Sequence, residues 1–179
     1  MKTVIVGCGR VGAELAEVFD RADHEVIVLD TSTRAFDRLP GTFRGSAVRG
    51  DGTDEDTLRR AGAEDADVFL ALTEGDNRNV MAAQVASEAL GARQVIAKIN
   101  DPLRGETYRA LGLETICRTI ILGDALVTAA IEGAEATNGF VEPPTAQPLT
   151  RAPAVVPVAE ETQPEATVLQ PGDGREGAL

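Results

Sequence analysis

The chain has 179 residues, of which 43% are hydrophobic, enough for one domain with a sizeable core. The formal net charge of -12 argues against nucleic acid as a partner, because phosphate contacts depend on lysine and arginine. The two cysteines, Cys8 and Cys117, are too few for a disulfide framework and fit no zinc motif. No apolar run approaches the ~20 residues of a membrane-spanning helix.

Short apolar runs alternate with amphipathic segments from the first residues to Asn138. The apolar runs predict strands at 3–6, 25–29, 46–50, 67–72, 94–99 and 114–118. Helical patterns cover 12–21, 31–39, 54–61, 77–90, 102–111 and 120–136. This alternation predicts an α/β fold, a Rossmann-like, doubly wound parallel sheet of six strands.

The segment Gly7-Cys8-Gly9-Arg10-Val11-Gly12 has the spacing GxGxxG. It follows a predicted strand and opens a predicted helix, which is the context in which this motif binds a dinucleotide or related phosphate compound. We expect Gly7 to permit a tight turn, Gly9 to let backbone amides approach a diphosphate, and Gly12 to let the helix pack closely on the strand. The helix N-terminus would then attract the phosphates.

Asp30 ends the second predicted strand, in HEVIVLD. A carboxylate at this place can accept both ribose hydroxyls and would repel a 2′-phosphate, so NADP is disfavoured. The alternative is a cap for the helix that we expect to start at Thr31. Arg10 could meet a terminal phosphate through two hydrogen bonds, or it could be an ordinary solvated arginine.

Further polar residues follow the later strands. Asp51 follows the third strand, in RGDGTDEDTL, and Lys98 ends the fifth. The segment ALTEGDNRN places Thr73, Asp76, Asn77 and Asn79 after the fourth strand. Each could be a turn or capping residue, but all are expected at the edge of the sheet where a doubly wound fold binds its ligand.

Two helical segments have unusual apolar patterns. The helix at 77–90 carries a mixed stripe that includes Val80, Met81 and Val85. The helix at 120–136 is apolar on several sides, whereas a sheet face covers only one side. It therefore either packs on the sheet as a terminal helix or is shared with another subunit. Seven of the nine prolines lie in 141–179, and this composition predicts a disordered acidic tail.

Five segments together resemble one family: VIVGCGRVG, HEVIVLD, GDGTDEDTLRRAG, DVFLALTEGDNRN and VIAKINDP. They are similar to the KTN domain, also called the N-lobe of RCK or TrkA-N domains, over residues 1–118. The GD-x-T segment followed by L-x-x-AG is not a general feature of dehydrogenases.

The resemblance implies a cytoplasmic regulatory subunit, peripheral at the inner face of the membrane, for a Trk/Ktr-type potassium channel or transporter. It implies no enzymatic activity, and partners that are a homodimer or larger ring and a potassium-translocating membrane subunit. The ligand would be an adenine nucleotide, with ATP or ADP slightly preferred to NAD or NADH. The implied nucleotide site comprises Gly7, Cys8, Gly9, Arg10, Val11, Gly12, Asp30, Thr31, Asp51, Gly52, Thr53, Thr73 and Lys98.

Within that site, the glycine-rich segment and Arg10 would hold phosphates and Asp30 the ribose. Asp51 and Thr53 would border the adenine, and Thr73 would lie near the ribose or the linking phosphates. The resemblance divides the chain into a nucleotide-binding domain (1–119), a crossover helix between subunits (120–138) and the tail (139–179). The tail stands where many relatives have a second lobe, which suggests a second regulatory subunit as a further partner.

Two other functions compete with this one. The first is an NAD-dependent oxidoreductase or a fragment of one, which would need a substrate domain and a proton donor. The only histidine, His24, is expected at the far end of the sheet from the glycine-rich segment. The second is a structural subunit that has lost its ligand, which the intact glycines and Asp30 argue against. We expect neither catalytic residues nor a metal site.

Overall fold

A computed structural model describes residues 1–132, in which all six expected strands are present. The strands are β1 (Lys2–Val6), β2 (Glu25–Asp30), β3 (Ser46–Arg49), β4 (Val68–Ala71), β5 (Gln94–Ile99) and β6 (Glu114–Cys117). The helices are α1 (Arg10–Arg21), η1 (Thr33–Arg38), α2 (Glu55–Arg60), α3 (Asp76–Glu88), α4 (Pro102–Ala110) and α5 (Arg118–Glu132).

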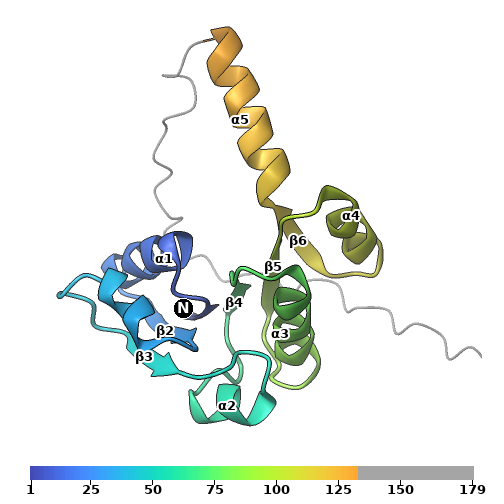
Figure 1. Ribbon diagram of the computed structural model, residues 1–179. Coiled ribbons are helices and arrows are strands. Elements are labelled where there is room, and N and C mark those ends of the chain that lie inside the picture. Colours follow the sequence, from blue (N-terminus) through green and yellow to red (C-terminus); the bar gives the residue numbers. More distant parts are fainter. Residues whose placement is uncertain (133–179) are drawn as a thin grey trace, which may run out of the picture.

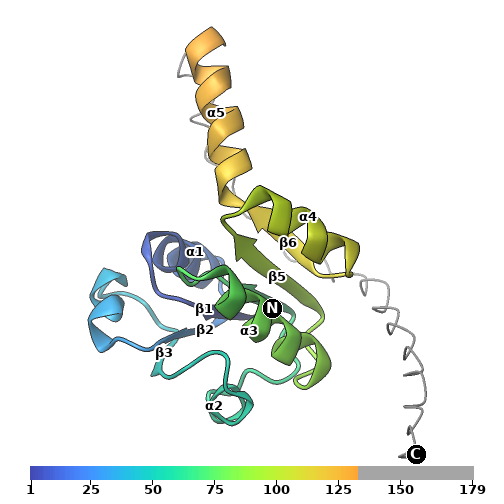
Figure 2. The same ribbon diagram turned by 45° about the vertical axis from the view of Figure 1, so that its right-hand side comes forward.

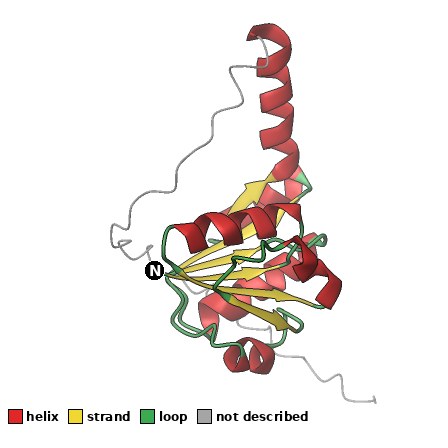
Figure 3. Cartoon of the chain, turned by 90° about the vertical axis from the view of Figure 1, so that its left-hand side faces the viewer, coloured by secondary structure: helices red, strands yellow, loops and turns green. Residues whose placement is uncertain are grey.

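The strands form one parallel sheet in the order β3-β2-β1-β4-β5-β6. Helices cover both faces of this sheet (Figure 3). The chain winds outward from β1 in one direction and then from β4 in the other, so the expected doubly wound Rossmann-like fold is confirmed. The carboxyl ends of all six strands lie along one edge, which we call the carboxyl edge.

The central strands are buried on both faces, which explains why their sequences are nearly continuous apolar runs. Val4 and Val6 of β1 belong to the core cluster that contains Leu58 of α2. Ile5, between them, belongs to the cluster that contains Ala16 of α1. The two clusters lie on opposite faces, and together they hold β1 rigidly behind the glycine-rich segment.

Three expectations about the helices need correction. The segment expected to be helical at 31–39 forms a short 3₁₀-helix, η1, over Thr33–Arg38. Met81 is 55% exposed, and the inner side of α3 is made by small residues such as Ala82 and Ala86. The last helix begins at Arg118, directly after β6, two residues earlier than expected. Its expected end at 136 and the tail lie outside the described residues.

Helix α5 projects away from the rest of the molecule (Figure 1 and Figure 2). None of its residues is buried. The alternative that this segment packs on the sheet as a terminal helix is therefore wrong. Six large apolar side chains are between 39% and 78% exposed: Ile120, Ile121, Leu122, Leu126, Val127 and Ile131. Within residues 1–132, no helix is long and apolar enough to cross a bilayer.

Candidate functional site

The glycine loop, residues 7–12, joins β1 to α1 at the carboxyl edge. Gly7 has φ +106°, a conformation that side-chain-bearing residues rarely adopt, and its N–H donates to the carbonyl of Leu29 at 2.7 Å. A Cβ atom on Gly12 would lie 2.0 Å from the carbonyl oxygen of Gly7, so α1 packs against the loop only with glycine there. A Cβ atom on Gly9 would meet nothing within 4 Å. The space in front of Gly9 is therefore open.

The N-terminus of α1 is exposed and has no cap from a side chain. Its N-cap residue is Gly9, and its first turn contains no acidic residue. By contrast, the side chains of Asp54 and Asp101 cap α2 and α4. Gly9, Arg10 and Val11 are exposed, with Val11 at 55%. The free N–H groups and the helix dipole give this end of α1 the character of an anion site.

Asp30 links the end of β2 to the glycine loop. Its Oδ2 accepts a hydrogen bond from the backbone N–H of Cys8 at 2.9 Å, and its Oδ1 accepts one from the N–H of Ser32 at 2.9 Å. It does not cap a helix, because Ser32 is the N-cap residue of η1 and Asp30 lies outside it. Each carboxylate oxygen can accept a second hydrogen bond, so the carboxylate keeps acceptor capacity for ribose hydroxyls. Thr31 follows it and is exposed.

The loop after β3 brings Asp51, Gly52 and Thr53 to the same edge. Asp51 Oδ1 accepts hydrogen bonds from Thr53 N at 3.0 Å and Thr53 Oγ1 at 2.8 Å. These bonds lower the pKa of Asp51, and the Arg78 guanidinium also lowers it. A Cβ atom on Gly52 would lie 2.2 Å from Val6 Cγ1, so the loop lies directly over the end of β1. Asp51 is therefore an ionised carboxylate that accepts hydrogen bonds within the turn after β3.

Thr73 and Lys98, after β4 and near the end of β5, are joined by one buried side chain. The Asn79 amide accepts hydrogen bonds from Thr73 N (2.8 Å) and Thr73 Oγ1 (2.6 Å). It also donates to the carbonyls of Thr73 (3.0 Å) and Lys98 (2.8 Å). Asn79 is fully buried, so this arrangement fixes the ends of the two strands relative to each other. The sequence placed Asn79 at this edge but gave no sign of this role.

Burial shifts the pKa of two groups at the carboxyl edge, Lys98 and Cys8. Burial lowers the pKa of Lys98, and the nearby Glu74 opposes that shift. Burial raises the pKa of the Cys8 thiol, and Asp30 raises it further. Cys8 packs with Ile5 in the core and is fully buried. Only its backbone N–H, bonded to Asp30, takes part in the geometry of the loop.

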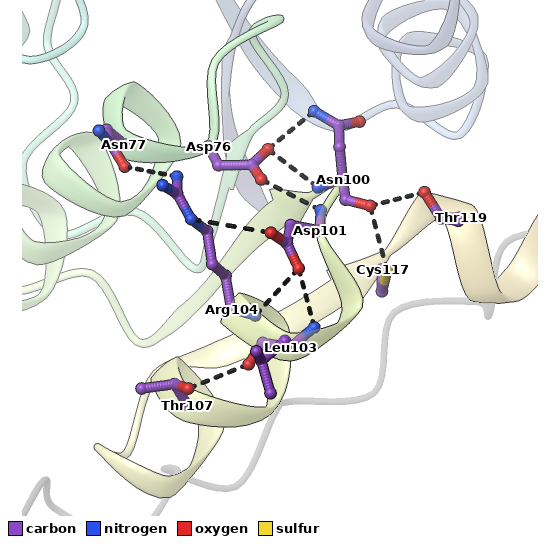
Figure 4. Close-up of polar contacts among 9 residues, drawn as sticks. All are labelled: Asp76, Asn77, Asn100, Asp101, Leu103, Arg104, Thr107, Cys117 and Thr119. Carbon is purple, nitrogen blue, oxygen red and sulfur yellow. Dashed lines mark hydrogen bonds and ion pairs between the residues drawn. The ribbon is translucent and has the colours of Figure 1, made fainter.

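A second polar cluster lies beside the site, where α3 and α4 begin (Figure 4). Asp76 Oδ1 accepts from Asn100 N at 2.9 Å and Asn100 Nδ2 at 2.7 Å, and Asp76 Oδ2 accepts from Asp101 N at 3.1 Å. Burial alone would raise the pKa of Asp76, but these hydrogen bonds outweigh it and lower the pKa. Arg104 completes the cluster by donating to Asn77 Oδ1 at 3.1 Å. Asn100 and Arg104 were missed from sequence as members of this cluster, although Asn100 lies in the VIAKINDP segment, because nothing in the sequence shows that they meet Asp76 and Asn77.

The structure thus brings most of the expected site residues to one edge. The glycine loop, Asp51 and Thr73 follow β1, β3 and β4, Asp30 ends β2, and Lys98 lies on β5. His24 lies at the opposite edge, just before β2. In the described part of the chain, no group of three or more His, Cys, Asp or Glu side chains could hold a metal ion. The residues expected to bind a ligand are thus placed along the carboxyl edge.

The family model of the TrkA-N domain matches residues 3–119. The chain belongs to the TrkA-N family. One relative of this TrkA-N chain is the "Trk system potassium uptake protein TrkA" of Streptomyces coelicolor, 47% identical over 116 residues. The match covers 65% of this chain and 52% of that protein, so this chain spans about half of that relative's length.

Solved structures show the same fold. GsuK bound to ADP matches with a TM-score of 0.61 at 22% identity, covering 73% of this chain and 34% of that one. The GsuK channel bound to NAD matches with a TM-score of 0.58, also at 22% identity, covering 70% and 23%. The Kef C-terminal domain of Shewanella denitrificans, in an AMP-bound form, matches with a TM-score of 0.59 at 21% identity, covering 76% and 82%.

Proposed function

We propose that this TrkA-N chain is a nucleotide-binding regulatory subunit of a membrane potassium channel or transporter. The observation that carries the proposal is the hydrogen bond between Cys8 N and Asp30 Oδ2. It fixes the group suited to a ribose against the loop suited to phosphates before any ligand arrives. Such preorganisation reduces the cost of binding a nucleotide.

In this proposal the nucleotide lies across the carboxyl edge. Its phosphates meet the open space at Gly9 and the N–H groups at the start of α1. Its ribose meets Asp30, and its adenine lies toward Asp51 and Thr53. Thr73 and Lys98 lie on the phosphate side, where the Lys98 ammonium can approach negative charge.

The preferred ligand is ATP or ADP, with NAD or NADH as the alternative and NADP disfavoured. Arg10 is the exposed first residue of α1, and there a guanidinium can meet a terminal phosphate. The Asp30 carboxylate would repel a 2′-phosphate. The neighbouring structures with ADP, NAD and AMP support an adenine nucleotide without favouring one of them.

The proposed partner is a potassium-translocating membrane subunit, met at the cytoplasmic face of the membrane. The name of the Streptomyces coelicolor relative, a potassium uptake protein, supports this partner. The exposed apolar residues of α5 support assembly as a homodimer or larger ring. Nucleotide would favour one geometry of that assembly, to the extent that it binds the two geometries with different affinity.

The proposed role is sensing without turnover, and an NAD-dependent oxidoreductase is the competing function. Thermal shift with ATP, ADP, NAD, NADH and NADPH tests the binding part, because a ligand stabilises the fold it binds by RT ln(1 + [L]/Kd). We expect stabilisation by ATP and ADP, less by NAD and NADH, and least by NADPH. Stabilisation by none of them would contradict the proposal, and rapid substrate-dependent NADH oxidation would favour the oxidoreductase.

Arg10→Ala tests the choice between nucleotides. If Arg10 meets a terminal phosphate, the variant loses roughly tenfold or more in ATP affinity, about 1.4 kcal/mol, and much less in NADH affinity. Calorimetric titration of both ligands into both proteins measures this difference. Equal losses, or tighter NADH binding by the wild type, would overturn the preference for ATP or ADP and leave the sensing role intact.

A further inference from the structure

The first turn of α5 is held to the body of the molecule by the backbone carbonyl of Asn100. Thr119 Oγ1 donates to this oxygen at 2.6 Å, and Cys117 Sγ donates at 3.7 Å (Figure 4). Since α5 buries none of its own residues, these polar contacts matter for the direction in which the helix leaves the sheet. Asn100 lies one residue beyond the end of β5.

The same residue is held from its other side by Asp76, the first residue of α3. Both the backbone N–H and the side-chain amide of Asn100 donate to Asp76 Oδ1, at 2.9 Å and 2.7 Å. The Asn100 amide also donates to the carbonyl of Glu74 at 3.2 Å. Asn100 therefore joins the loop between β4 and α3 to the start of α5.

That loop contains Thr73, a residue of the proposed nucleotide site. Thr73 is bonded to the buried Asn79 amide, which also holds the carbonyl of Lys98. Two sets of hydrogen bonds therefore lie between the site and the first turn of α5, one at Asn79 and one at Asn100. Short stretches of backbone join the two sets, from Thr73 to Glu74 and from Lys98 to Asn100. Most of these bonds are partly buried, whereas the bond from Thr119 is exposed. The contact between Asn100 and Thr119 is therefore the one most easily broken and reformed.

We propose that Asp76, Asn100 and Thr119 are positioning residues that make the orientation of α5 depend on the occupancy of the nucleotide site. This inference rests on the proposed function, because it names the connection through which a bound nucleotide alters the assembly. A nucleotide that draws the loop at Thr73 and Lys98 toward its phosphates would shift Asn100 through Asn79 and Asp76. If Thr119 keeps its hydrogen bond to Asn100, α5 would change direction with it. If that bond breaks, α5 would become more mobile.

Hydrogen–deuterium exchange of the full chain, with and without saturating ATP or NADH, tests the inference in residues 118–132. Thr119→Val removes the hydroxyl while keeping the shape of the side chain. Thr107→Val is the matched control, because Thr107 is also exposed on a helix but donates only within α4, to the carbonyl of Leu103 at 3.0 Å. Asp76→Asn is a second variant. The amide nitrogen that replaces one carboxylate oxygen cannot accept a hydrogen bond, so the bonds from Asn100 and the bond from Asp101 cannot all be kept.

In the wild type, we expect either nucleotide to change the exchange of residues 118–132. Thr119→Val and Asp76→Asn should reduce that change at least about twofold, in line with loss of a coupling between sites, while Thr107→Val retains it. The nucleotide affinity of Thr119→Val, measured by calorimetry, should stay within about threefold of the wild type. Bound nucleotide without any change in α5, or a full change in Thr119→Val, would overturn this inference alone. No binding of either nucleotide to the wild type would overturn the proposed function and this inference with it.

Discussion

The body of the molecule, from β1 to β6, and helix α5 are both rich in large apolar residues, yet they bury them to opposite extents. The body encloses most of its valines, leucines and isoleucines in two clusters, one on each face of the sheet. Helix α5 leaves six such side chains exposed. The body thus buries its own core, whereas α5 has an exposed apolar surface that we propose is covered by another chain.

The two regions also differ in the kind of molecule that each can bind. The carboxyl edge of the body offers free N–H groups, which suit phosphate oxygens, and the Asp30 carboxylate, which suits ribose hydroxyls. Helix α5 offers apolar area, which suits a protein surface. Changes in the body should therefore alter folding stability or nucleotide affinity, and changes in α5 should alter association.

The largest effect is expected for Gly12→Ala, which tests whether α1 packs tightly against the glycine loop. The new Cβ would lie 2.0 Å from the Gly7 carbonyl oxygen, so backbone must move. We expect a loss of about 3 kcal/mol in the free energy of unfolding, measured with urea, despite the better helix propensity of alanine. Gly9→Ala is the control and should lie within about 0.5 kcal/mol of the wild type. Equal stability of the two variants would show that the loop is not packed as described.

Asp30→Ala should have the next largest effect, on ligand binding. We expect ATP affinity to fall by about 1–3 kcal/mol, because hydrogen bonds to a charged group are lost and the N–H of Cys8 loses its acceptor. Calorimetry measures the change. Unchanged affinity would remove the assignment of the ribose to Asp30.

Leu126→Glu should affect association and leave the body unchanged. Leu126 is 61% exposed in the single chain, so a charge there costs the fold little but disrupts an apolar contact between subunits. We expect at least a tenfold weaker dimer by light scattering, about 1.4 kcal/mol, with the body still folded by circular dichroism. Met81→Glu, at an exposed apolar position on α3, should leave association unchanged. A wild type that is already monomeric at micromolar concentration would contradict the shared-helix interpretation.

The smallest effect is expected from removing residues 139–179. From their composition, which is poor in large apolar groups, we expect these residues to add little to the stability of the fold. A chain that ends at Asn138 should melt within about 2 °C of the full chain, because a shift of this size corresponds to well under 1 kcal/mol. A large decrease would mean that this segment packs on the body or across a subunit interface.

The sheet and the glycine loop could be predicted from sequence because their signals are local. Buried parallel strands appear as continuous apolar runs, and the GxGxxG spacing fixes the turn that follows β1. The inner side of α3 was harder to predict, because close packing on the sheet selects small residues such as Ala82 and Ala86 over the larger Met81. The short 3₁₀-helix η1 has no distinctive periodicity.

The polar connections between strand ends could not be predicted. Asp76 and Asn100 are separated by 24 residues, and Thr119 lies 19 residues beyond Asn100. Side-chain hydrogen bonds between such distant segments leave no periodic pattern and depend on how the strand ends are arranged in space. The sequence indicated which residues reach the carboxyl edge, but not which of them are bonded to one another.

The most direct test of the central claim, that an adenine nucleotide binds at the glycine loop, is calorimetric titration of ATP and NADH into the wild type and Gly9→Ala. The methyl group of Gly9→Ala would occupy the open space in front of the loop, where no protein atom lies within 4 Å. We predict binding to the wild type and at least tenfold weaker binding to Gly9→Ala, about 1.4 kcal/mol, at unchanged folding stability. Binding of neither nucleotide to the wild type, or the same affinity in both proteins, would contradict the claim.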